Sequence, residues 1–193
     1  MNADRSRWGW EAHYAERGAA ARAPAPVLER HLPPDHRGRA LDLACGDGRH
    51  ALRLARHGLN VDAIDIAFTG LRRLVVAARA EDLALQVLQA DLEEFPLPIA
   101  RYAMVVNVRY LQRSLFPAIR RAVAPGGVVV FETFLRAQAQ LGHPRNPAFL
   151  LEPGELRAQF AGFEILEDAE GLCDGDTTPA YLARLVARRP RGD

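Results

Sequence analysis

The chain has 193 residues, 49% of them hydrophobic and 25% charged, which fits one globular domain with a full core. The formal net charge of +1 predicts no broad basic surface for nucleic acid, and no run approaches the ~20 apolar residues that span a bilayer. All 25 basic residues are arginine. This composition suggests a GC-rich bacterial genome and excludes mechanisms that need a catalytic lysine.

The two cysteines, Cys45 and Cys173, lie far apart and have no metal-ligand spacing. The first five residues are polar and contain no apolar segment typical of a signal peptide. We therefore predict reduced thiols, no metal site and a soluble protein of the cytoplasm.

Short apolar runs alternate with longer amphipathic stretches along the chain. Strands are expected at 39–43, 60–65, 85–88, 102–106, 128–131, 163–167 and 181–186. Helices are expected at 8–17, 47–57, 67–82, 114–124 and 153–160, with Ser114 as a candidate N-cap. Strands separated by helices predict an α/β fold in which helices cover both faces of a parallel sheet. The last two strands have no helix between them, which predicts an antiparallel ending.

The turn after the first strand carries the most information about function. It reads Asp42-Leu43-Ala44-Cys45-Gly46-Asp47-Gly48-Arg49. Small residues at 44, 46 and 48 allow a tight turn and the close approach of a ligand to the backbone. This is the switch point of an open α/β sheet, where ligands bind. Asp42 can accept hydrogen bonds from a ligand ammonium or from loop amides, and Asp65 ends the second strand, where a ribose diol would lie.

Two cofactor classes fit this turn. Residues 46–51 also satisfy the G-x-G-x-x-A fingerprint of dinucleotide-binding proteins. However, Asp42 and Asp47 flank the glycines, which suits a ligand without phosphate, and a further acid, Asp91, follows the third strand. We also expect the strands and helices of this one domain to use nearly all residues of the chain, which leaves none for a dehydrogenase catalytic domain.

These residues resemble the class I S-adenosylmethionine (SAM)-dependent methyltransferases, and within them the small bacterial group that includes tellurite-resistance-like methyltransferases. Asp42, Ala44, Gly46 and Gly48 match the family's acid-x-G-x-G-x-G motif, with alanine in place of the first glycine. The resemblance covers nearly the whole chain. It implies SAM as the cofactor and a Rossmann-like sheet of seven strands, mostly parallel, with an antiparallel last strand.

The resemblance also implies roles for residues after the second, third and fourth strands. Asp65 would bind the ribose hydroxyls, and Ile66 would pack on the adenine face. Asp91 would bind the adenine amino group, and the Leu92 amide would contact the adenine ring. Asn107 would lie by the methionine part. The alternatives are that Asp65 is a helix-capping acid and that Asp91 belongs to a solvated acidic turn.

By the same resemblance, the chain divides into an N-terminal helical segment over the site, 1–25, and a SAM-binding domain, 26–193. Trp8, Trp10 and Tyr14 match an aromatic N-terminal entry of the resembled group. They either cover the cofactor or anchor the segment to the core.

The acceptor site is less defined. Asn107 is not followed by the two prolines of methyltransferases that act on nucleobase or glutamine amino groups. SAM carries its own leaving group, so the protein mainly aligns the nucleophile and excludes water. No catalytic triad is expected. His143 is the first candidate for a general base, and Tyr110 is the second.

Two arginines are candidates for contacting the acceptor. Arg109 follows the fourth strand, and Arg145 lies in the long loop after the fifth. Either they pair with acids of the protein, such as Glu132 or Glu11, or they bind an anionic acceptor, because guanidinium groups suit carboxylates and other oxyanions.

We therefore predict a SAM-dependent methyltransferase that acts on a small-molecule acceptor and has no nucleic-acid or membrane partner. The alternatives are a non-catalytic module that binds SAM or a nucleotide, and an NAD-dependent oxidoreductase.

Overall fold

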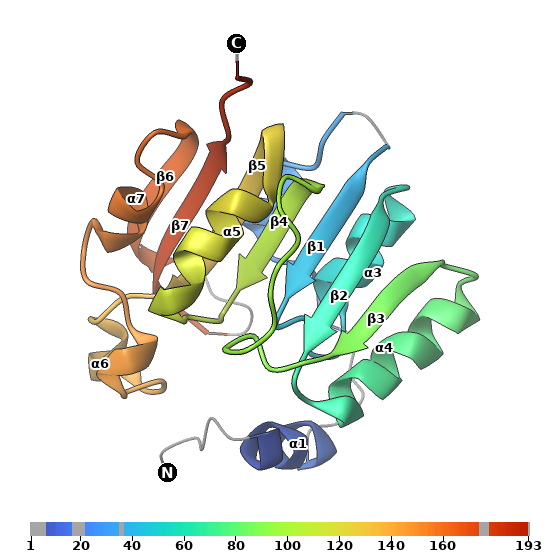
Figure 1. The fold of residues 1–193 in the computed structure, drawn as a ribbon. Coiled ribbons are helices and arrows are strands. Elements are labelled where there is room, and N and C mark those ends of the chain that lie inside the picture. Colours follow the sequence, from blue (N-terminus) through green and yellow to red (C-terminus); the bar gives the residue numbers. More distant parts are fainter. Residues whose placement is uncertain (1–6, 17–21, 35–36, 174–177, 193) are drawn as a thin grey trace. The chain divides into compact units, whose positions relative to one another are not determined.

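The computed structural model comprises two compact units, residues 1–96 and 97–193 (Figure 1). The residues that it describes are 7–16, 22–34, 37–173 and 178–192. Parts of the N-terminal segment expected at 1–25 therefore fall outside the described residues.

The first unit contains three parallel strands in the order β3-β2-β1, with α3 and α4 packed on them. Its described elements are α1 (Arg7–Glu16), α2 (Pro26–Arg30), β1 (Arg39–Leu43), α3 (Arg49–Arg56), β2 (Asn60–Asp65), α4 (Phe68–Ala80) and β3 (Leu85–Gln89). The helix α2 was not expected from the sequence. The other elements lie within two residues of their expected bounds, because the apolar periodicity that predicted each of them also forms its buried face.

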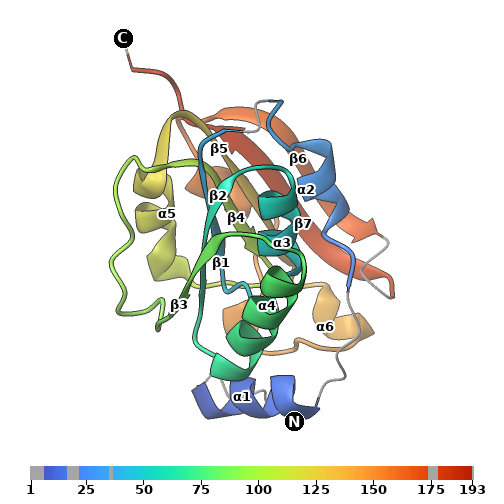
Figure 2. The ribbon, with the colours of Figure 1, turned by 90° about the vertical axis from the view of Figure 1, so that its right-hand side faces the viewer.

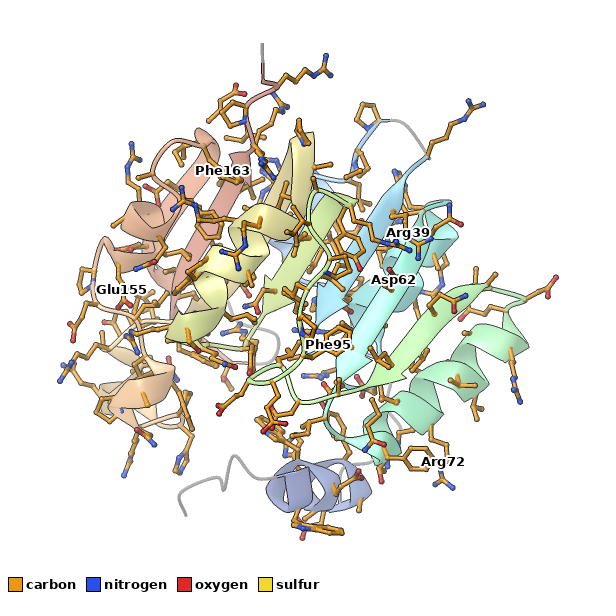
Figure 3. The ribbon with its side chains drawn as sticks, in the orientation of Figure 1. Arg39, Asp62, Arg72, Phe95, Glu155 and Phe163 are labelled. Atoms are coloured by element: carbon orange, nitrogen blue, oxygen red, sulfur yellow. The ribbon has the colours of Figure 1, made fainter. Side chains whose placement is uncertain are left out.

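The core of this unit follows directly from that periodicity. Leu71, Leu74 and Ala78 form the buried stripe of α4 at helical spacing. Each fully buried leucine contributes about 1.5–3 kcal/mol relative to an exposed one. Arg39, the first residue of β1, and Asp62 of β2 form a partly exposed ion pair with an Nη2–Oδ1 distance of 2.5 Å (Figure 3).

The second unit contains four strands in the order β4-β5-β7-β6. β4 and β5 are parallel, whereas β7 runs antiparallel to both of its neighbours. Its described elements are β4 (Tyr102–Val108), η1 (Arg113–Leu115), α5 (Phe116–Ala122), β5 (Val123–Phe134), α6 (Gln138–Leu141), η2 (Pro147–Phe149), α7 (Glu155–Gln159), β6 (Glu164–Cys173) and β7 (Ala180–Arg188).

The strand pattern confirms the predicted Rossmann-like fold of seven strands, mostly parallel, with an antiparallel ending. An aromatic cluster forms part of the core of the second unit. Phe116 stacks on Phe131 at a centroid distance of 5.3 Å, and Phe160 meets Phe116 edge-on at 6.0 Å. None of the described helices combines the length and apolar character that crossing a membrane requires.

Two local predictions were wrong. Ser114 lies in the short 3-10 turn η1, and α5 begins at Phe116 without a side-chain cap. The strand expected at 128–131 begins five residues earlier, at Val123, so Pro125-Gly126-Gly127 lies inside β5. Backbone bonds to the end of β7 explain its strand assignment, since Gly126 N donates to Arg189 O at 2.9 Å and Arg189 N donates to Gly127 O at 2.8 Å.

Candidate cofactor and acceptor sites

The loop between β1 and α3 has the tight geometry expected for ligand binding. Gly46 and Gly48 adopt φ values of 58° and 84°, in the left-handed region that favours glycine. Gly48 N donates to Cys45 O at 2.9 Å, and Cys45 N donates to Ile64 O of β2 at 3.0 Å. These bonds fix the loop at the carboxyl ends of β1 and β2. Ala44 also has a positive φ, 50°, although it has a side chain.

Packing around the loop also requires the two glycines. A Cβ at Gly46 would lie 2.0 Å from the Tyr14 hydroxyl, and a Cβ at Gly48 would lie 2.2 Å from Leu74 Cδ1. Real Cβ atoms essentially never approach another atom below 3.0 Å. Even alanine at either position would therefore displace a neighbouring side chain, so these are not interchangeable turn glycines.

Asp42 is a buried acid with one engaged oxygen. Its Oδ2 accepts a hydrogen bond from Ala51 N at 2.9 Å, whereas its buried Oδ1 has no partner among the described residues. Burial raises the pKa of this carboxyl to about 8, although the Ala51 bond and the nearby Arg49 partly oppose the shift. A bound cation beside Oδ1 would favour the ionised form.

Asp65 joins the loop to α4. Its Oδ2 accepts from Gly46 N at 2.7 Å, and its Oδ1 accepts from Ala67 N at 2.8 Å, just before α4. Burial raises the pKa of Asp65, while the bonds from backbone amides act in the opposite direction. Asp65 therefore bonds the amide just before α4, whereas the amides of Phe68 and Thr69 in its first turn donate to Glu11. A carboxylate oxygen has two lone pairs, so these bonds are compatible with the ribose role, which stays a prediction.

The residues expected around the adenine occupy the ends of β2 and β3. Asp91 is exposed, and its Oδ1 accepts from Glu93 N at 2.9 Å, as in the alternative of an acidic turn. Leu92 is buried, and Ile66 is half-buried. Their contacts with adenine stay predictions.

The helix α1 lies across the carboxyl ends of β1 and β2, against the start of α4 (Figures 1 and 2). The Glu11 carboxylate accepts from Phe68 N at 2.6 Å and from Thr69 N at 3.0 Å. These amides belong to the first turn of α4, where an acid is stabilised by the helix dipole. Glu11 thus caps α4 from another helix, a role that sequence spacing alone could not reveal.

Tyr14 brings an aromatic ring of α1 onto the loop. It is buried, and its hydroxyl lies close to Gly46. Burial raises the pKa of the phenol well above its usual range, and the nearby Asp65 and Asp47 add to the shift. Tyr14 is therefore a neutral hydrogen-bond donor at physiological pH. Trp10 packs near Tyr14 at a ring distance of 6.5 Å, whereas Trp8 is 75% exposed.

Asn107, at the end of β4 in the second unit, is fully buried. Its Nδ2 donates to Tyr110 O at 2.7 Å, and its Oδ1 has no hydrogen-bond partner among the described residues. Among all described residues, Asp42 Oδ1 and Asn107 Oδ1 are the two buried side-chain oxygens without a hydrogen-bond partner. Both belong to residues assigned to the cofactor from the sequence.

A buried carboxylate binds two arginines in the second unit. Glu132 Oε2 accepts from Arg184 Nε at 2.8 Å, and Glu132 Oε1 lies 3.5 Å from Arg109 Nη2. The strand register places Glu132 of β5 opposite Arg184 of β7. The Arg109 guanidinium also lies 4.5 Å from the centre of the Phe134 ring. Arg109 thus pairs with Glu132, one of the two acids considered, and Arg184 is a neighbour that the sequence analysis missed.

The other acceptor candidates lie in different surroundings. The Tyr110 hydroxyl donates to Gln112 Oε1 and is half-buried. His143 and Arg145 have exposed side chains, and the His143 carbonyl accepts from Gln138 Nε2 at 3.1 Å. Their catalytic roles stay predictions.

The loop that contains His143 and Arg145 is held at its end by Arg113, a residue that we had not singled out from the sequence. Arg113 Nε donates to Glu155 Oε1 at 2.6 Å, and Arg113 Nη2 donates to Glu155 Oε2 and to Leu150 O, both at 2.9 Å. A bidentate pair of this kind fixes both direction and distance. Arg113 therefore joins the end of this loop to α7.

The donor set fits SAM. The buried Asp42 Oδ1, which has no hydrogen-bond partner among the described residues, suits a ligand ammonium. In the described part of the chain, no group of three His, Cys, Asp or Glu side chains is arranged to hold a metal ion. The fold and this loop have the features of class I methyltransferase domains, which bind SAM.

Comparisons with known proteins agree with this class. A family model described as "Methyltransferase domain" matches residues 40–127. A malonyl-[acyl-carrier protein] O-methyltransferase from Enterobacter lignolyticus is 31% identical over 126 residues, which are 63% of this chain and 49% of that protein. The chain therefore spans about half the length of this relative.

Solved structures share the fold. TehB from Haemophilus influenzae superposes with a TM-score of 0.75 at 19% identity, over 93% of this chain and 67% of TehB. A SAM-dependent methyltransferase from Methanosarcina mazei gives a TM-score of 0.70 at 17% identity, over 88% of this chain and all of that chain.

Proposed function

We propose that this protein transfers the methyl group of SAM to a small-molecule acceptor that carries a carboxylate or another oxyanion. The observation that supports the cofactor part most strongly is the unpartnered, buried Asp42 Oδ1 beside a glycine loop. The relative from Enterobacter lignolyticus is named for action on a malonyl group, which contains a carboxylate.

For the cofactor, we assign the methionine ammonium to Asp42 and the methionine part to Asn107. The backbone at Ala44, Gly46 and Gly48 forms the wall against which the cofactor lies. The proposed adenosine contacts are Asp65 for the ribose hydroxyls, Asp91 and the Leu92 amide for adenine, and Ile66 for its face. The N-terminal segment, 1–25, covers the bound cofactor, with Tyr14 as its inner residue.

For the acceptor, we assign the anionic group to Arg109 and Arg145. Arg109 and Arg184 both lie against Glu132, and the charge of Glu167 also acts on Arg184. The support for an anionic acceptor is the chemistry of the guanidinium group, whose N–H donors match the oxygens of a carboxylate.

When bound, SAM supplies a methyl group activated by its sulfonium. The protein contributes alignment and the exclusion of water. Where the acceptor atom carries a proton, we assign its removal to His143 first and to Tyr110 second. The composition, in which arginine replaces lysine throughout, and the free, buried thiol of Cys45 support a place in the bacterial cytoplasm.

The test combines calorimetry with a methyl-transfer screen. S-adenosylhomocysteine at 100 times its dissociation constant should stabilise the protein by about 2.7 kcal/mol, and NAD should not. Small acids, amines, thiols and oxyanions are then screened with labelled SAM, using the wild type, Arg109→Ala and Arg145→Ala. A neutral or cationic preferred acceptor, or full turnover of an acid by both variants, would refute the anionic site. Cofactor binding without any transfer would favour the non-catalytic module.

A further inference from the structure

The outward surface of α4 is unusual for a helix that faces solvent. Phe68, Arg72, Val76 and Arg79 lie on this surface, which we call the α4 outer face. Phe68 is 56% exposed and Val76 is 64% exposed. Their spacing of eight residues, with Arg72 midway, aligns them along one side of the helix. The buried stripe that packs on the strands lies on the opposite side.

Among the described residues, the exposed arginines of α4 have no acidic partner. From Ile66 to Ala80 the chain contains three arginines and no acid. Arg72 and Arg79 are exposed, and neither side chain makes an ion pair or hydrogen bond with a described residue. By contrast, Arg53 and Arg56 of α3 pair with Glu29 and Glu81. Figure 3 shows Arg72 extending from α4 away from the strands of its unit.

This face begins next to the cofactor loop. Phe68 is the first residue of α4, and the preceding amide, Ala67 N, donates to Asp65. A partner seated on the N-terminal half of α4 would therefore lie near the carboxyl ends of β1 and β2, where the cofactor is expected.

We propose that the α4 outer face docks a small, acidic, helical protein of the acyl-carrier type, which brings the acceptor to the enzyme. Apolar side chains beside unpaired arginines are complementary to an amphipathic helix with acidic edges. A second copy of the same face would oppose arginine to arginine. Two apolar side chains are also too few to insert a helix into a bilayer. This inference rests on the proposed methyl transfer, because the partner delivers the acceptor.

Binding is measured between the full chain and a fluorescently labelled bacterial acyl carrier protein, by anisotropy at low and high salt. We expect saturable binding that weakens with salt, since steering between exposed charges is screened. Arg79→Glu should weaken it at least fivefold. Arg121→Glu is the matched control, because Arg121 also lies in the last turn of a helix and is exposed. Val76→Ser should weaken binding without changing its salt dependence.

The controls separate this inference from the proposed function. Calorimetry with S-adenosylhomocysteine should give the same affinity for wild type, Arg79→Glu and Val76→Ser. Absence of carrier-protein binding with intact cofactor binding would overturn the docking surface alone. Equal loss in Arg79→Glu and Arg121→Glu would overturn it as well, because the attraction would then be a general charge effect. Binding of anionic vesicles in preference to the carrier protein would also refute it.

Discussion

The two units hold their buried acids in different ways. In the first unit, Asp42 and Asp65 accept hydrogen bonds from backbone amides of the loop and of adjacent helix starts. In the second unit, Glu132 binds side chains, those of Arg184 and Arg109. Bonds to local backbone fix a loop whose residues are close in sequence, and such a loop leaves a recognisable motif. Bonds between side chains depend on strand register, and their partners are distant in sequence.

The sharpest test of the first arrangement is Gly48→Ala, with Gly154→Ala as its control. Both glycines lie just before a helix and have a positive φ. However, a Cβ at Gly154 would meet nothing within 4 Å. We expect Gly48→Ala to lower the free energy of unfolding by about 3 kcal/mol, from backbone strain plus the clash with Leu74. Gly154→Ala should cost about 1 kcal/mol. Equal losses in urea denaturation would show that only the backbone conformation matters at Gly48.

The matching test in the second unit is Glu132→Gln. Removing the buried charge leaves Arg184, which is 18% exposed, without its ionic partner. We expect a loss of about 2 kcal/mol in unfolding free energy and unchanged affinity for S-adenosylhomocysteine. Glu164→Gln, which breaks an exposed pair with Arg188, should cost less than about 0.5 kcal/mol. A large loss of cofactor affinity in Glu132→Gln would contradict the view that Glu132 stabilises the second unit without taking part in cofactor binding.

Asp42→Asn should raise the free energy of unfolding at high pH, although most substitutions of a buried polar residue lower it. The pKa of Asp42 is about 8 in the folded chain, above the ~3.9 of an unfolded aspartate. The folded state therefore binds an additional proton between these values, and wild-type stability falls as pH rises through this range. The variant, which does not titrate, should gain roughly 2 kcal/mol over wild type between pH 6 and 9. Urea denaturation at both pH values measures this difference.

The same residue predicts a pH dependence of cofactor binding. The ammonium group of S-adenosylhomocysteine favours the ionised carboxylate, so wild-type affinity for this ligand should rise as pH approaches 8 and then level off. Asp42→Asn should bind about tenfold more weakly at pH 8 and lose this dependence. A variant with wild-type affinity across the range would show that Asp42 serves the loop alone.

The smallest expected effect is that of Tyr14→Phe. Loss of one neutral hydroxyl donor should weaken S-adenosylhomocysteine binding by about 1 kcal/mol, or roughly fivefold, with little effect on folding. Trp8→Phe is the control on the same helix, because Trp8 is 75% exposed. Calorimetry that finds the two variants equal would assign α1 a purely structural role.

The parts that could be predicted are those whose cause is local. Apolar periodicity gave the strands and most helices, and the small residues at 44, 46 and 48 indicated the loop. Contacts between distant residues could not be predicted in this way. The Glu11 cap of α4 spans 57 residues, and the Arg184–Glu132 pair spans 52. The cap before α5 was misplaced because Ser114 offered a plausible side chain, whereas the helix begins two residues later without one.

The docking of α1 has a kinetic consequence. Glu11 anchors this helix to two amides of α4, and the ring of Tyr14 rests on the glycine loop, which is itself fixed by backbone bonds. If the cofactor lies beneath α1, product can leave only as fast as the helix detaches. Glu11→Gln should then accelerate release of S-adenosylhomocysteine more than it weakens affinity. Stopped-flow fluorescence of Trp10, which lies beside Tyr14, would follow that opening directly.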